Sequence, residues 1–135
     1  MKLMYTLLFL VGLSPILIAQ SQEVDQRLVD ALGQETVDDL SVKSPFLLEY
    51  KTALLDHSWE IQDFPEDKLA SMPEINLKRS ELRNPNVLIW MKKLNLTRAK
   101  DHHKYYRIGR SNQVLVLFSE DHFAEQFNKL SGRVK

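Results

Sequence analysis

The sequence predicts an α+β fold in which N-terminal helices are followed by a four- to five-stranded antiparallel sheet and then by a C-terminal helix. Three observations carry this prediction: helical periodicity up to residue 57, short alternating or apolar runs between residues 59 and 118, and a capped helical pattern after Ser119. Runs of helices followed by runs of strands are typical of α+β domains rather than of alternating α/β folds.

The helical part of the prediction comes first in the chain. Apolar residues recur at helical spacing over residues 24–32, and Gly33 follows where a helix commonly ends. Residues 36–40 can form a further short helical turn. Ser44 then offers an N-cap before Pro45, which predicts a helix from Pro45 to about His57.

The following runs predict strands. Alternation over residues 59–64 indicates a strand, and residues 75–77 indicate a weaker one. The continuous apolar run at residues 87–91 favours a strand buried on both faces. Residues 105–108 and 114–118 form a predicted hairpin through a four-residue connection, and we expect the runs at 87–91 and 114–118 to be central.

A final helix is predicted after the hairpin. Ser119 is a good N-cap, and two acidic residues follow it in the first turn. Phe123, Phe127 and Leu130 share one face of this helix, and Gly132 closes it.

Residues 1–19 have the layout of a secretory signal peptide. Lys2 is followed by an uncharged, apolar stretch up to Ala19, and Ala19-Gln20-Ser21 has the small-residue spacing of a cleavage site. We expect cleavage after Ala19, with Ser21 and an uncleaved anchor as the alternatives. The prediction is an exported protein, periplasmic or secreted, with a single domain at residues 20–135 and no stable membrane span after cleavage.

The composition limits the chemistry. The chain has 135 residues, no cysteine and a formal net charge of zero. This length predicts one domain. The lack of cysteine excludes disulfides, thiolate nucleophiles and cysteine-ligated zinc.

The zero net charge hides an asymmetry along the chain. Residues 20–77 carry a net charge of −9, whereas residues 78–135 carry +8. One interpretation is a basic contact surface, for which the candidate binding residues are Lys92, Lys93, Arg98, Arg107 and Arg110. The partner would be an anionic polymer or another envelope protein. The other interpretation is that an acidic helical layer and a basic sheet pack together and largely cancel. No nucleic-acid-binding signature accompanies the basic residues, so we expect no nucleic acid partner.

Histidines are the candidates for catalysis or metal binding. His102 and His103 follow Asp101, but neighbouring side chains diverge on a strand or helix and chelate poorly. His122 and Glu125 share one face of the predicted last helix, but the sequence offers no second group of ligands that would complete a metal site with them. No nucleophile elbow or metal-ligand spacing is present. We therefore assign no catalytic residue, metal or cofactor.

Several segments together resemble small exported bacterial proteins of uncharacterised function. They are Ile18-Ala19-Gln20, Trp59-Glu60-Ile61 with Phe64-Pro65, and Tyr105 to Gly109 followed by residues 114–118. The resemblance implies a bacterial envelope or extracellular setting and carries no activity with it.

The sequence leads to one function hypothesis with two alternatives. The leading hypothesis is an exported, non-enzymatic binding or structural module. The alternatives are a hydrolase, with or without a metal, that uses His102, His103 or His122 with a carboxylate, and an adaptor that binds an anionic polymer through the basic C-terminal half.

Overall fold

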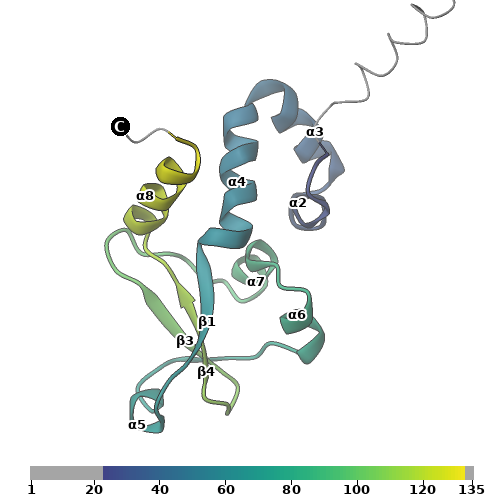
Figure 1. Cartoon of the computed structure of the whole chain (residues 1–135). Helices are drawn as coiled ribbons and strands as arrows, with labels where there is room; N and C mark the ends of the chain where they lie inside the picture. The colour runs from purple at the N-terminus through teal and green to yellow at the C-terminus, as the bar shows by residue number, and fades with distance from the viewer. Residues whose placement is uncertain (1–22, 133–135) are drawn as a thin grey trace, which may run out of the picture.

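The computed structural model describes residues 23–132, and the predicted signal peptide at residues 1–19 lies outside the described residues. The described part is an α+β fold in which helices precede a four-stranded sheet and a helix follows it (Figure 1). In chain order the elements are α2 (Gln26–Leu32), α3 (Gln34–Lys43), α4 (Pro45–His57), β1 (Trp59–Asp63), α5 (Glu66–Leu69), β2 (Glu74–Ile75), α6 (Arg79–Arg83), α7 (Val87–Lys93), β3 (Lys104–Ile108), β4 (Gln113–Leu117) and α8 (Glu120–Leu130).

The sheet is mixed, so the prediction of a wholly antiparallel sheet is wrong. Of the four to five strands predicted, the sheet has four. The strand order is β1-β4-β3-β2, with β4 antiparallel to both neighbours and β2 parallel to β3. The chain passes from β2 to β3 through a long connection that contains α6 and α7. A crossover of this kind, unlike a hairpin turn, brings the next strand back in the same direction.

Strand β4 lies in the interior of the sheet, as predicted for residues 114–118, and it is buried on both faces. Leu115 and Leu117 belong to the core cluster beneath α7. Val114 and Val116 point to the opposite face, where they pack with Leu69 of α5. Alternate side chains of one strand therefore build two separate cores.

Residues 87–91 form most of helix α7, so the prediction of a buried strand there is wrong. The side chain of Asn86 caps this helix by accepting a hydrogen bond from the backbone N–H of Ile89 at 3.3 Å. Val87 and Trp90 pack on the sheet, whereas Leu88 contacts the helical clusters as well as the sheet cluster. A short helix enclosed on several sides is apolar nearly all round, and its sequence then looks the same as that of a buried strand.

Helices α2, α3, α4 and α8 lie at one end of the sheet, α5 lies at the other end, and α6 lies beside the sheet (Figure 1). Helix α4 runs from Pro45 to His57 as predicted, with Ser44 as its N-cap. Helix α8 is capped by Ser119 as predicted. Between α2 and α3 the backbone reverses at Gly33, whose φ of 89° disfavours any side chain.

Within residues 23–132, no helix has the length and apolar character that crossing a bilayer requires.

The cap of α7 gives a test of its helical state. Asn86 is 7% exposed, caps α7 and donates a hydrogen bond from Nδ2 to the Arg27 carbonyl of α2 at 2.9 Å. We expect Asn86→Ala to lower the free energy of unfolding by about 2 kcal/mol, because a cap and a buried hydrogen bond are both lost. Urea denaturation measures this, with Asn76→Ala at an exposed position as the control. Equal stability of the two variants would contradict the assigned role of Asn86.

Candidate functional site

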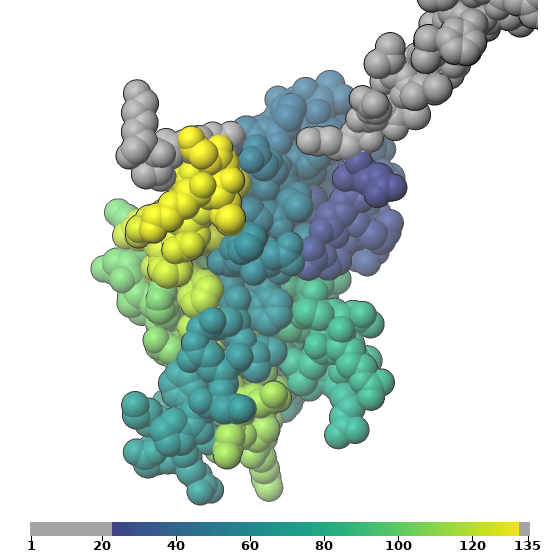
Figure 2. All heavy atoms as spheres, in the orientation of Figure 1, coloured from purple at the N-terminus to yellow at the C-terminus, as the bar shows by residue number. Residues whose placement is uncertain are grey.

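An open groove of about 1290 Å³ runs along helix α4. Figure 2 shows α4 with α8 on one side and α2 on the other. The groove is lined by Glu23, Val24, Asp25, Gln26, Leu28, Ser41, Pro45, Phe46, Leu48, Glu49, Thr52, Ala53, Asp56, His57, Phe127, Leu130 and Ser131. All of these residues come from helices or from the segments next to them, and none comes from a strand.

The two walls of the groove are held by different faces of α4. Leu55 belongs to a cluster with Leu28 of α2 and Val37 of α3. Leu54 belongs to another cluster with Phe123 and Phe127 of α8. Successive helical residues point about 100° apart, so the face of α4 that carries neither leucine remains open between the walls.

Apolar side chains are exposed at the edges of this groove. Phe46 is 51% exposed and Leu130 is 59% exposed, although both line the groove. Val24 on the opposite wall is 40% exposed. Single exposed apolar residues are ordinary, whereas several that border one concavity mark a candidate contact site.

Among the described residues that line the groove, the Asp and Glu side chains are Glu23, Asp25, Glu49 and Asp56, and there is no Lys or Arg. Arg27 links two of them, with nitrogen–oxygen distances of 2.8 Å to Asp25 and 2.8 Å to Asp56. Its hydrogen bond holds the pKa of the Asp25 carboxyl below the usual value. Arg27 therefore fastens α2 to α4, and the border of the groove keeps a negative charge.

The structure does not bring the five basic candidate residues into one surface. Arg98 packs over the ring of Phe123, with 5.4 Å to the ring centroid, and its Nε and Nη1 atoms are buried without a hydrogen-bond partner. Burial lowers the pKa of Arg98, and its interaction with Tyr50 opposes this shift. Arg98 thus joins α8 to α4.

The other four candidates lie in two places. Arg107 donates to the carbonyl oxygens of Ser111 and Arg110, which fixes the hairpin turn. Lys92 and Lys93 end α7, and Lys93 is paired with Glu81 of α6. Figure 1 shows the turn between β3 and β4 well separated from α7. Lys92 and Arg110 are exposed.

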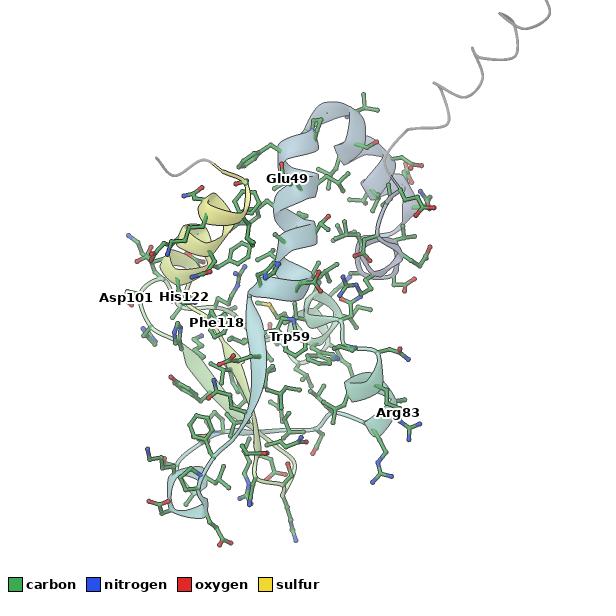
Figure 3. All side chains as sticks on the ribbon, in the orientation of Figure 1. Glu49, Trp59, Arg83, Asp101, Phe118 and His122 are labelled. Atoms are coloured by element: carbon green, nitrogen blue, oxygen red, sulfur yellow. The ribbon has the colours of Figure 1, made fainter. Side chains whose placement is uncertain are left out.

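A denser basic region surrounds α6 and the end of α7. We call it the α6–α7 basic surface, and it consists of Lys78, Arg79, Arg83, Lys92 and Lys93. Figure 3 shows Arg83 pointing away from the body of the protein. Glu81 is the acidic residue of this region, and its ion pair with Lys93 lowers the pKa of the Glu81 carboxyl.

Two histidines meet where β4 passes into α8. The rings of His103 and His122 are 5.1 Å apart in an edge-to-face arrangement, and both contact Phe118. Figure 3 shows His122 close to Phe118. The backbone N–H of Ser119 donates to Nδ1 of His103 at 3.0 Å.

His102 does not join this pair. It is exposed and its Nδ1 lies 2.9 Å from the carboxylate of the neighbouring Asp101. Within the described residues, no group of three or more histidine, aspartate or glutamate side chains is placed to hold a metal ion. The three histidines of the hydrolase alternative therefore do not form one site in this structure.

Sequence reasoning missed both the groove and the histidine pair. The pair could have been found, because Lys104 lies opposite Leu117 in the hairpin, which places His103 beside Phe118 and the start of α8. The groove had no local signal, since its walls come from residues about 100 positions apart in the chain.

No family model, curated protein or solved structure matches this chain, so the resemblance to small exported bacterial proteins stays a prediction.

The hydrogen bond to His103 gives a test with a neighbouring control. We expect His103→Ala to lower the free energy of unfolding by about 1–2 kcal/mol, because the Ser119 N–H loses its acceptor. His102→Ala at the exposed neighbouring position should change it by less than about 0.5 kcal/mol. Chemical denaturation measures both variants, and equal effects would show that His103 has no special structural role.

Proposed function

We propose that this protein is an exported, non-enzymatic binding module that contacts its partner through the α4 groove. The observation that carries the proposal is the combination of an open groove of about 1290 Å³ with exposed Phe46 and Leu130 at its edge. A surface that leaves large apolar side chains in water becomes more stable when a partner covers them.

The hydrogen bonds in the groove favour binding over catalysis. A catalytic base or nucleophile is oriented by a hydrogen-bonded neighbour. Among the described groove residues, Asp25 and Asp56 are both ion-paired with Arg27, an arrangement that fixes α2 to α4 and does not orient a base or nucleophile. The groove histidine, His57, makes no hydrogen bond to a serine or a carboxylate of the described residues.

Export is the part of the proposal that rests on sequence alone. The predicted leader at residues 1–19 supports an envelope or extracellular location, where the partner would be another envelope protein.

Site-specific photo-crosslinking tests the groove as the contact surface. A photoreactive phenylalanine analogue at Phe46 or Leu130, in cells that export the protein, should give one discrete adduct. Leu130→Asp should abolish the adduct formed from position 46. The control position is Val42 on α3, which is 82% exposed and outside the groove. No adduct from either groove position, or the same adduct from Val42, would contradict the proposal.

The α6–α7 basic surface supports a second candidate function, binding of an anionic polymer. Five basic side chains with one acidic residue among them form a local positive field. Retention on immobilised heparin should fall with salt and should drop strongly in a triple variant with Arg79, Arg83 and Lys92 each changed to Glu. Lys43→Glu and Lys129→Glu on the other helices are the charge controls. Equal retention of the triple variant and the controls would show that the α6–α7 basic surface does not bind the anionic polymer.

A further inference from the structure

We infer that the partner of the α4 groove presents an amphipathic helix with lysine or arginine beside its apolar face. This inference rests on the proposed function and specifies the class of partner. The shape of the groove, its charge and the elements that line it each support the inference.

The shape of the groove fits a helix. Its floor is α4, whose 13 residues span about 20 Å at 1.5 Å per residue. The middle of the floor carries the small side chains Thr52 and Ala53, so a second helix can approach α4 closely there. A docked helix of about 13 residues would contact α2 on one side and α8 on the other, in the way amphipathic helices bind apolar grooves.

The charge of the groove selects a basic partner. Glu23 lies at its border together with the Asp25–Arg27–Asp56 linkage, and no lysine or arginine is among the lining residues that the structure describes. Lysine or arginine beside the apolar face of a docked helix would face these carboxylates, whereas an acidic helix would be repelled.

An extended peptide fits this surface less well than a helix does. Strand addition requires unpaired backbone groups at the edge of a sheet. The lining residues belong to α2, α3, α4, α8 and adjoining segments, so a peptide in the groove has no strand edge with which to pair.

The test uses the full chain expressed in an exporting host, in the form that the cell produces. The probe is a 14-residue leucine–lysine peptide patterned as an amphipathic helix and measured by isothermal titration calorimetry. A leucine–glutamate peptide of the same pattern and a scrambled leucine–lysine peptide are the ligand controls. We expect the patterned cationic peptide to bind at least tenfold more tightly than either control, and more weakly as salt is raised.

Matched variants locate the binding. Leu130→Asp should weaken binding of the cationic peptide at least tenfold, because an unpaired charge enters the apolar contact. Val42→Asp, outside the groove, should leave it unchanged. Glu23→Lys should weaken binding, whereas Glu35→Lys on α3 should not. Leu130 is 59% exposed, so we expect its variant to fold, and a circular dichroism spectrum checks this.

Four results would overturn the inference: no binding, equal binding of the scrambled peptide, equal loss in the groove and control variants, or preferential binding of the leucine–glutamate peptide. The proposed function would survive these results if photo-crosslinking at positions 46 and 130 still gave a specific adduct. Absence of that adduct would overturn the proposed function itself.

Discussion

The arrangement of the helices depends on two adjacent leucines of α4 that pack in different directions. Leu55 holds α2 and α3, and Leu54 holds α8. Because the two side chains are about 100° apart on the helix, the elements they hold cannot close over the remaining face. The groove is therefore a consequence of how α4 is packed. Arg27 reinforces one wall through its ion pairs, and Arg98 reinforces the other through its contacts with Phe123 and Tyr50.

Helix α7 connects this helical layer to the sheet. Leu88 packs against the sheet cluster and against both helical clusters, and Trp90 is buried edge-to-face against Trp59 with 5.3 Å between ring centroids. The charge asymmetry of the sequence is also visible in the two candidate surfaces. The acidic N-terminal half supplies the charged residues that line the groove, whereas the basic C-terminal half supplies the α6–α7 basic surface. The two candidate contact surfaces thus have opposite charge.

Elements with local signals could be predicted from the sequence, and elements fixed by distant contacts could not. Ser44-Pro45 and Ser119 start α4 and α8 because a side-chain cap acts within one turn. The apolar run at residues 87–91 predicts a strand but forms helix α7. A helix that is buried on several sides lacks the one-sided apolar spacing by which helices are recognised. The two-residue strand β2 and its parallel pairing depend on contacts with β3, which no short sequence window contains. The groove could not be predicted either, because its lining residues come from segments as distant in the chain as 23–28 and 127–131.

The most direct test of this account compares Leu54→Ala with Leu55→Ala by amide hydrogen exchange. If the two leucines hold separate walls, Leu54→Ala should speed exchange in α8 and leave α2 and α3 nearly unchanged. Leu55→Ala should speed exchange in α2 and α3 and leave α8 nearly unchanged. Similar acceleration of all three helices in both variants would show that the helical layer is one cooperative core, and would contradict the account.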